Sequence, residues 1–321
     1  MRVALLFSPQ GSQSVGMGRE LASTSAAAQE IFEMADAALG WRVSTLAWEG
    51  PEEQLNDTRQ TQPCLVATSV ACLRALEEAA AMRSERLAPV FVAGHSVGEY
   101  AALVAAGALT FLDAMHLVAR RGTLMADADV SGGMVAVIGL DRDAVATVVD
   151  SVRAGADLVL ANDNAPGQVV ISGTPAALAA ASPLLRAAGA RRSIPLKVSG
   201  PFHSPLMAGV GADLAGSFAT ASWHDADPPV VSNVTAEPVH DADEIRALLA
   251  RQVDSPVEWV RSIRRMAADG VDTFVECGPG GALTGMVRRI LPQARTLNIY
   301  DASSLGESLD ALLGASVGVL A

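Results

Sequence analysis

Cysteine, lysine and long apolar runs are all scarce in this 321-residue sequence. The three cysteines, Cys64, Cys72 and Cys277, form no Cys-x-x-Cys pair, so we expect small buried side chains in a reducing compartment. The longest apolar stretches, such as residues 101–109, are much shorter than the roughly 20 residues of a membrane-spanning helix. We therefore expect a cytoplasmic protein without a membrane segment or a signal peptide.

Basic charge comes almost entirely from arginine, because Lys197 is the only lysine, and the formal net charge is -12. A negative charge of this size argues against binding to nucleic acid and to anionic membranes. The five histidines show no paired ligand spacing, so the sequence predicts no metal site. An acidic partner would need a local basic cluster, since the overall field repels it.

The first 126 residues alternate short apolar runs, at 3–7 and 89–93, with helical patterns such as 62–81. This alternation predicts a parallel sheet covered by helices on both faces. Half of the residues are hydrophobic, and the length allows more than one compact domain. Further elements of the same domain are expected at 230–233, 273–277 and 305–313.

A different pattern runs from residue 127 to residue 199. Its order, strand-helix-strand-strand-helix-strand, is that of a ferredoxin-like fold. We predict an α/β-hydrolase-like parallel-sheet domain made of residues 1–126 and 200–321, with a small ferredoxin-like (βαββαβ) domain inserted at 127–199. The expected small-domain elements are strands at 134–138, 158–161, 168–172 and 193–198, helices at 141–152 and 174–188, and a polar turn at 162–164.

Gly94-His95-Ser96-Val97-Gly98 matches the Gly-x-Ser-x-Gly pattern of a nucleophile elbow. A sharp strand-to-helix turn leaves no room for side chains two residues on either side of the serine, which explains both glycines. The first N–H groups of the following helix can then face a developing oxyanion. An apolar strand precedes the motif and a helical pattern follows it, so Ser96 is predicted to be a nucleophile. The alternative is an ordinary glycine-flanked turn.

A serine nucleophile needs a general base, which is usually histidine. His203 lies in a loop fixed by two prolines and a glycine, where the inserted domain returns to the larger one. That position would hold it over the cleft between the domains. Elimination favours His203, although the residues themselves supply no obvious third member of a triad. The remaining histidines are expected to pack, to orient a neighbour or to be exposed: His95, His116, His224 and His240.

Seven motifs, spread over nearly the whole chain, have the order and spacing of one known family. They are Phe7-Ser8-Pro9-Gln10-Gly11-Ser12-Gln13, Gln60-Thr61-Gln62-Pro63, Gly94-His95-Ser96-Val97-Gly98-Glu99-Tyr100, Arg121-Gly122, Asn164-Ala165-Pro166-Gly167-Gln168-Val169-Val170, Phe202-His203-Ser204 and Cys277-Gly278-Pro279-Gly280. Together they resemble the malonyl-CoA:acyl carrier protein transacylases, including the discrete acyltransferases of polyketide synthases.

The resemblance implies a monomeric acyltransferase of fatty acid or polyketide synthesis, with Ser96 as nucleophile and His203 as base. The backbone N–H groups of Gln10 and Val97 would form the oxyanion hole. The main-chain carbonyl of Gln252 would orient the histidine without a carboxylate. Malonyl-CoA and an acyl carrier protein would react in ping-pong order. No cofactor is implied, because CoA enters as part of the substrate.

The resemblance also bears on the acyl group. Arg121 aligns at helical spacing with an apolar stripe, whereas Arg120 aligns with a polar face. A buried guanidinium needs an anion, since an unpaired buried charge is costly. The anion is either an internal carboxylate or, as the family implies, the free carboxylate of malonate. Phe202 resembles the malonyl-selecting version of its loop, whose ring would crowd a branched acyl group. One departure is Ser8-Pro9, where the family has Pro-Gly, next to Gln10.

Several alternatives remain open from the sequence alone. They are transfer of another acyl group by a trans-acting polyketide acyltransferase, an acyl hydrolase on the same fold, an ordinary α/β-hydrolase esterase, and a non-catalytic module that binds carrier protein. Two basic clusters are candidate docking sites for an acidic carrier protein. These clusters are Arg191, Arg192 and Lys197, and Arg288 with Arg289.

Overall fold

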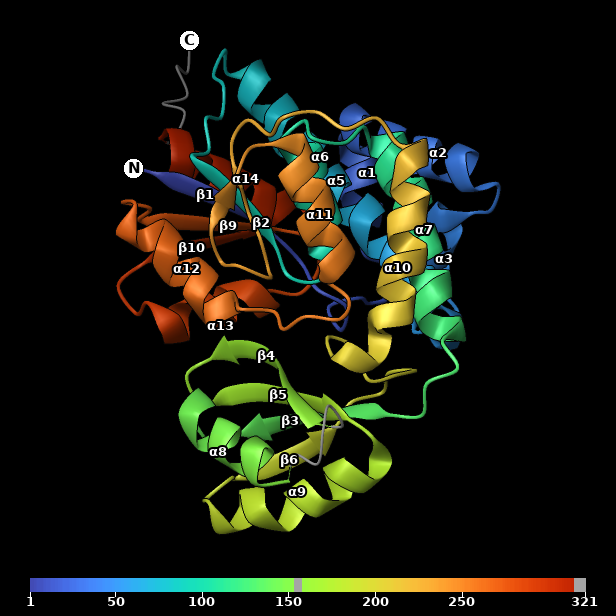
Figure 1. The fold of residues 1–321 in the computed structure, drawn as a ribbon. Helices are drawn as coiled ribbons and strands as arrows, with labels where there is room; N and C mark the ends of the chain where they lie inside the picture. Colours follow the sequence, from blue (N-terminus) through green and yellow to red (C-terminus); the bar gives the residue numbers. More distant parts are fainter. Residues whose placement is uncertain (153–157, 315–321) are drawn as a thin grey trace.

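The computed structural model describes residues 1–152 and 158–314. Figure 1 shows a large body built around one sheet and a small body built around another, with strand β4 of the small body nearest the large one. Within the described residues, no helix has both the length and the apolar character needed to cross a bilayer.

The large sheet has six strands in the order β10-β9-β1-β2-β7-β8. All neighbours are parallel except β7 and β8, which pair antiparallel. The central strand β1 is buried from Ala4 onward, as expected for a parallel strand that is covered on both faces. The strands are β1 (Val3–Phe7), β2 (Phe91–Gly94), β7 (Val230–Val231), β8 (Pro238–Val239), β9 (Thr273–Cys277) and β10 (Arg295–Ile299).

Helices cover both faces of this sheet. They are α1 (Arg19–Thr24), α2 (Ala26–Leu39), α3 (Val43–Glu49), α4 (Glu52–Leu55), α5 (Thr58–Met82), α6 (Gly98–Ala105), α7 (Phe111–Asp127), α10 (Ala208–Ser217), α11 (Ala242–Arg251), α12 (Trp259–Ala268), α13 (Ala282–Ile290) and α14 (Ala302–Leu313), with short 3₁₀ turns η1 (Pro205–Met207) and η2 (Phe218–Thr220).

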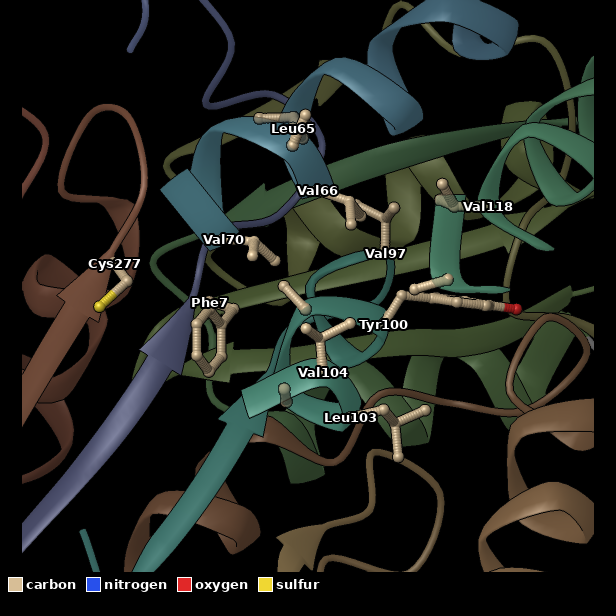
Figure 2. Packing of buried hydrophobic residues seen from close by; sticks show 14 of the residues in the cluster. Phe7, Leu65, Val66, Val70, Val97, Tyr100, Leu103, Val104, Val118 and Cys277 are labelled. Atoms are coloured by element: carbon tan, nitrogen blue, oxygen red, sulfur yellow. The ribbon is translucent and has the colours of Figure 1, made fainter. Parts of the chain in front are cut away.

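The helix α5 begins earlier than the predicted residue 62. The carboxylate of Asp57 accepts the N–H of Arg59 and so starts the helix at Thr58. The larger core lies where α5 and α6 pack against β1 and β2, as Figure 2 shows. The side chains drawn there come from these elements and from α7 and β9, and they include Phe7, Leu65, Val66, Val70, Val97, Tyr100, Leu103, Val104, Val118 and Cys277.

The small sheet has four antiparallel strands in the order β4-β5-β3-β6. This arrangement, with two helices between the strands, is the ferredoxin-like fold, so the predicted fold class is confirmed. The predicted boundaries at 126 and 200 stay a prediction. The elements are β3 (Gly133–Ile138), α8 (Arg142–Val152), β4 (Leu158–Ala165), β5 (Gln168–Gly173), α9 (Pro175–Ala187) and β6 (Arg192–Pro195).

The predicted polar turn at 162–164 is wrong, because these residues continue β4. Their main chain pairs with Val257 of the large body. The N–H of Asp163 donates to the carbonyl of Val257, and the N–H of Val257 donates to the carbonyl of Ala161. This second partner shifts the β4–β5 register at the same place, as a bulge does. Two other predicted strands are shorter than expected, since β6 ends at Pro195 and β7 at Val231.

Candidate active site

The predicted elbow connects β2 to α6 through Ser96, whose φ of 52° is unusual for a residue with a side chain. A Cβ on Gly94 would lie 1.9 Å from the main-chain carbon of Gly98. A Cβ on Gly98 would lie 2.2 Å from the carbonyl oxygen of Phe7. Only glycine fits at either position, so this motif has the close packing that a nucleophile elbow requires.

His203 lies against the elbow. Its Nε2 is 2.8 Å from Ser96 Oγ, and its Nδ1 is 2.8 Å from the main-chain oxygen of Gln252 and 3.2 Å from that of Ser255. Two carbonyl oxygens accept at Nδ1, so Nδ1 carries the proton and Nε2 is free to accept from the serine hydroxyl. His203 also has a positive φ, 58°, in a loop where its N–H donates to the carbonyl of Val253.

Burial, and after it the positive charge of Arg121, lower the pKa of His203 to about 3. The imidazole is therefore neutral at physiological pH, which is the form that a general base needs. His95 is different, because its Nε2 lies 2.8 Å from Asn164 Oδ1 and its ring packs edge-on against Trp259. Burial lowers the pKa of His95 to about 4.

Arg121 is 1% exposed and faces the same serine. Its Nη2 donates to Ser96 Oγ at 3.1 Å and to Gln252 Oε1 at 3.0 Å, and its Nη1 donates to Gln62 Oε1 at 2.7 Å. In the described part of the chain, no carboxylate oxygen lies within 4.0 Å of this guanidinium. The predicted alternative of an internal carboxylate partner is therefore wrong: neutral amides hold the arginine, and its charge is not paired.

One predicted oxyanion donor lines the cavity at Ser96, and the other directly follows Ser96 in the chain. Val97 is the N-cap of α6, and Gln10 lines the cavity that contains Ser96. Across residues 1–152 and 158–314, neither main-chain N–H has a protein acceptor. The departure at Ser8 is accommodated, because its hydroxyl donates to the buried carboxylate of Glu276 at 3.0 Å.

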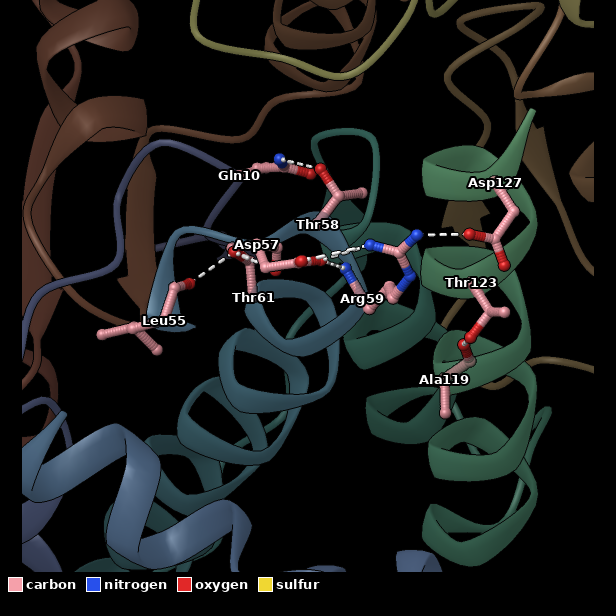
Figure 3. A network of polar contacts seen from close by, with 9 residues as sticks. All are labelled: Gln10, Leu55, Asp57, Thr58, Arg59, Thr61, Ala119, Thr123 and Asp127. Atoms are coloured by element: carbon pink, nitrogen blue, oxygen red, sulfur yellow. Dashed lines mark hydrogen bonds and ion pairs between the residues drawn. The ribbon is translucent and has the colours of Figure 1, made fainter. Parts of the chain in front are cut away.

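The first loop is tied to helix α5, and α5 is tied to α7 (Figure 3). Gln10 Nε2 donates to Thr58 Oγ1 at 3.1 Å, and Arg59 forms ion pairs with Asp57 and Asp127. These contacts join the start of α5, which carries Gln62, to the end of α7, which carries Arg121.

The cavity at Ser96 has a volume of about 150 Å³ and is lined by both bodies. A larger cavity of about 460 Å³ lies between α9 and the small sheet, but none of its lining side chains is a histidine or a charged residue. The volume of a cavity therefore does not identify the active site, whereas the convergence of polar groups on one cavity does. The lining residues are Pro9, Gln10, His95, Ser96, Met125, Met134, Asn162, Asn164, Val170, Leu196, Val198, Phe202, His203 and Met286.

Every site residue predicted from the sequence lies at this cavity or contacts one that does. The sequence analysis missed the groups that hold them: the side chains of Gln62, Glu99, Asn164 and Asn233, and the main-chain oxygen of Ser255. Gln62, Glu99 and Asn164 belong to motifs already noted, but a sequence motif does not indicate which residues its members contact. Asn233 and Ser255 carry no such signal.

The comparisons with known proteins agree with this geometry. The acyl transferase domain family matches residues 4–309. A malonyl CoA-acyl carrier protein transacylase of Bacillus subtilis is 42% identical over 314 residues, covering 97% of each chain. Its counterpart in Escherichia coli is 40% identical over 309 residues, covering 96% of this chain and 98% of its own.

Solved structures give the same result. An acyl carrier protein S-malonyltransferase of Vibrio cholerae superimposes with a TM-score of 0.91 at 38% identity, covering 96% of this chain and 100% of its own. A malonyl-transacylase solved in complex with its type II polyketide acyl carrier protein gives 0.91 at 38% identity, covering 97% and 100%. The chain therefore belongs to the acyl transferase domain family, among the malonyl CoA-acyl carrier protein transacylases that its motifs resemble.

Proposed function

We propose that this acyltransferase moves a malonyl group from malonyl-CoA to the phosphopantetheine thiol of an acyl carrier protein. The transfer takes two steps through an ester on Ser96. One observation carries the malonyl assignment: the buried guanidinium of Arg121, which forms no ion pair within residues 1–152 and 158–314, lies 3.1 Å from Ser96 Oγ. A carboxylate one carbon beyond the reacting carbonyl would supply the missing anion in a bidentate geometry.

In the first step, Ser96 Oγ attacks the thioester carbonyl while His203 Nε2 takes the hydroxyl proton. The oxygen that becomes negative would accept from the N–H groups of Gln10 and Val97. The C–S bond breaks, and the departing CoA sulfur receives the proton from His203. In the second step, the carrier thiol gives its proton to His203 and attacks the seryl ester. The bond between the acyl carbon and Ser96 Oγ breaks, and Oγ takes the proton back from His203.

The charges favour a substrate that carries its own carboxylate. Arg121 stabilises negative charge at Ser96 Oγ, but it also disfavours the imidazolium that His203 becomes, since it lowers the pKa of that ring. A malonyl carboxylate paired with Arg121 would neutralise this opposing charge and raise the pKa of His203 toward the range useful for a base. An acetyl group has no carboxylate and would leave the charge of Arg121 unneutralised.

Further parts of the proposal concern selection against branched acyl groups, the oligomeric state and the location of the enzyme. The ring of Phe202 lines the cavity and would crowd a 2-methyl branch, a discrimination worth about 1–3 kcal/mol. We also propose a monomeric, cytoplasmic enzyme that serves fatty acid or polyketide synthesis. No bound cofactor enters the steps above, so transfer should survive dialysis against a chelator.

The test is the ratio of malonyl to acetyl loading on Ser96, measured by mass spectrometry in Arg121→Ala and in wild type. Loss of the clamp should cost about 3–5 kcal/mol for malonyl, the range for breaking a buried pair, with little loss for acetyl. Arg120→Ala is the matched control, because its side chain is exposed on the same helix. A folded Arg121→Ala protein that keeps a strong malonyl preference would contradict the malonyl assignment.

A further inference from the structure

The strained elbow is held by a side chain that the mechanism above does not use. Asn233 follows β7 and is 0% exposed. Its Oδ1 accepts the N–H of Ser96 at 2.7 Å, and its Nδ2 donates to the carbonyl of Gly94 at 2.6 Å. One amide therefore bridges the last residue of β2 and the residue with the positive φ.

The orientation of this amide is fixed by its partners. Ser96 offers a donor and Gly94 an acceptor, so the oxygen must face Ser96 and the nitrogen must face Gly94. The main chain of Asn233 is also fully used: its N–H donates to Glu99 Oε2 at 3.2 Å, and its carbonyl accepts from Glu258 N–H at 2.9 Å. Four hydrogen bonds hold one buried residue, which makes it a rigid support.

The bridge also affects which elbow N–H groups have a protein acceptor. His95 N–H donates to Phe7, Ser96 N–H to Asn233, and Gly98 N–H to His95. Of the four N–H groups from 95 to 98, the structure leaves that of Val97 without a protein acceptor. With Ser96 N–H occupied, the N–H of Val97 is the one left at the start of α6 for an oxyanion.

We infer that Asn233 is a positioning residue that holds Ser96 in its reactive conformation and directs the elbow N–H groups. The inference rests on the proposed role of Ser96 as nucleophile. Backbone strain of the kind seen at Ser96 persists only where surrounding contacts enforce it, and Asn233 contacts both the N–H of Ser96 and the carbonyl of Gly94. An ionised carboxylate of the same size has two acceptors and no donor, so it cannot replace this amide.

The test is the rate at which Ser96 is acylated by malonyl-CoA, followed by quenched-flow mass spectrometry in wild type and in Asn233→Asp. The ionised variant keeps an acceptor for Ser96 N–H but turns a carboxylate oxygen toward the Gly94 carbonyl. We expect acylation to slow about 10²-fold, the effect of a displacement near 1 Å. The KM for malonyl-CoA should change little, because the Arg121 contacts are untouched.

A protonated carboxyl group has the same donor-acceptor pattern as an amide. The ratio of variant to wild-type acylation should therefore rise as the pH is lowered, a recovery that a merely destabilised protein would not show. The carboxyl group of Glu99 on α6 accepts the N–H of residue 233, and when ionised it raises the pKa of a carboxyl group placed there.

Ser44→Ala is the control for stability alone, since it removes a buried hydrogen bond to Asp36 far from the elbow. It should leave acylation unchanged. Equal acylation rates in wild type and Asn233→Asp would overturn the inference. So would a slow variant whose acylation rate, relative to that of wild type, does not change with pH. If Asn233→Asp does not fold, Asn233→Ser decides in its place, because normal acylation there would also overturn it. Failure of wild type to label Ser96 would instead contradict the proposed function.

Discussion

The main-chain oxygen of Gln252 accepts from Nδ1 of His203 at 2.8 Å, so a peptide carbonyl does the work that a carboxylate does in many serine enzymes. A carbonyl fixes the tautomer but adds no negative charge. With burial and Arg121 both lowering its pKa, the ring remains neutral until substrate arrives. The orienting group is a main-chain atom, so a side-chain substitution at 252 does not remove it.

Loss of the base should slow transfer without removing the nucleophile. We expect His203→Ala to reduce malonyl transfer by about 10²–10⁴-fold, the usual contribution of a general base. Ser96→Ala should form no acyl adduct at all, because no other side chain of the elbow can hold the ester. Mass spectrometry after exposure to malonyl-CoA measures both. A labelled Ser96→Ala protein, or an unaffected His203→Ala protein, would move the chemistry elsewhere.

Gln62 should influence the choice of acyl group without touching the serine. Its Oε1 is 2.7 Å from Arg121 Nη1, and among the described residues its Nε2 has one hydrogen-bond acceptor, Met125 Sδ, at 3.4 Å. A hydrogen bond to a charged group is worth about 1.5–3 kcal/mol, so Gln62→Leu should lower malonyl loading about 10- to 100-fold relative to acetyl. Gln60→Leu changes the other glutamine of the motif and should leave the ratio alone. An unchanged ratio in Gln62→Leu would show that Gln252 alone holds the arginine.

Short sequence patterns predicted the architecture well where the local structure that they favour is also the one that tertiary packing requires. The apolar run of β1 and the glycines around Ser96 both act over a few residues, and each is found as expected. The turn expected at 162–164 failed for the opposite reason. Its polar residues looked solvated, but their main chain pairs with Val257, almost a hundred residues away.

The candidate site shows the same division. The family motifs identified the residues that meet at the cavity, including Gln252, whose side chain also donates to Ser96 O and to Glu99. They did not predict that Arg121 lacks a carboxylate partner, since a count of partners requires coordinates. They also gave no indication of Asn233, because a lone asparagine after a short strand has no local pattern.

Glu99 should make the protein less stable as the pH rises toward neutrality. Burial raises its pKa from 4.5 to about 7, partly offset by hydrogen bonds from Gln252 and Asn233. Between these values the folded chain holds a proton that the unfolded chain has lost, so the stabilisation present at low pH disappears as the pH rises through 7. His95 and His203 act in the opposite sense, because burial lowers the pKa of each and their stabilisation is lost as the pH falls.

Glu99→Gln isolates this contribution, because the amide stays neutral at every pH. From about pH 5 to about pH 6, the unfolding free energy of wild type should fall relative to the variant by about 1.4 kcal/mol, the equivalent of one proton. Urea unfolding of both proteins at the two pH values gives the difference directly. If the difference in unfolding free energy is the same at both pH values, the pKa of Glu99 does not change on folding.

Lys197 is the basic residue best placed to receive an acidic carrier protein. It is exposed and lines a cavity of about 330 Å³ together with Gln10, and its neighbours Leu196 and Val198 line both this cavity and the one at Ser96. In the second predicted cluster, by contrast, Arg289 already binds Gln168 Oε1 at 2.7 Å. A rim charge acts mainly on the association rate and is screened by salt.

Lys197→Glu should therefore lower kcat/KM for the carrier protein about 10-fold at low salt, and the deficit should shrink as ionic strength rises. Loading of Ser96 should be measured with a malonyl thioester of a short uncharged thiol, because the phosphates of CoA would also sense the substitution. That loading should be unchanged, which separates docking from chemistry. Arg74→Glu makes the same charge change on α5, more than two turns beyond the residues at the site, and should have a much smaller effect. If both variants use the carrier equally well at low salt, the carrier protein docks on another face.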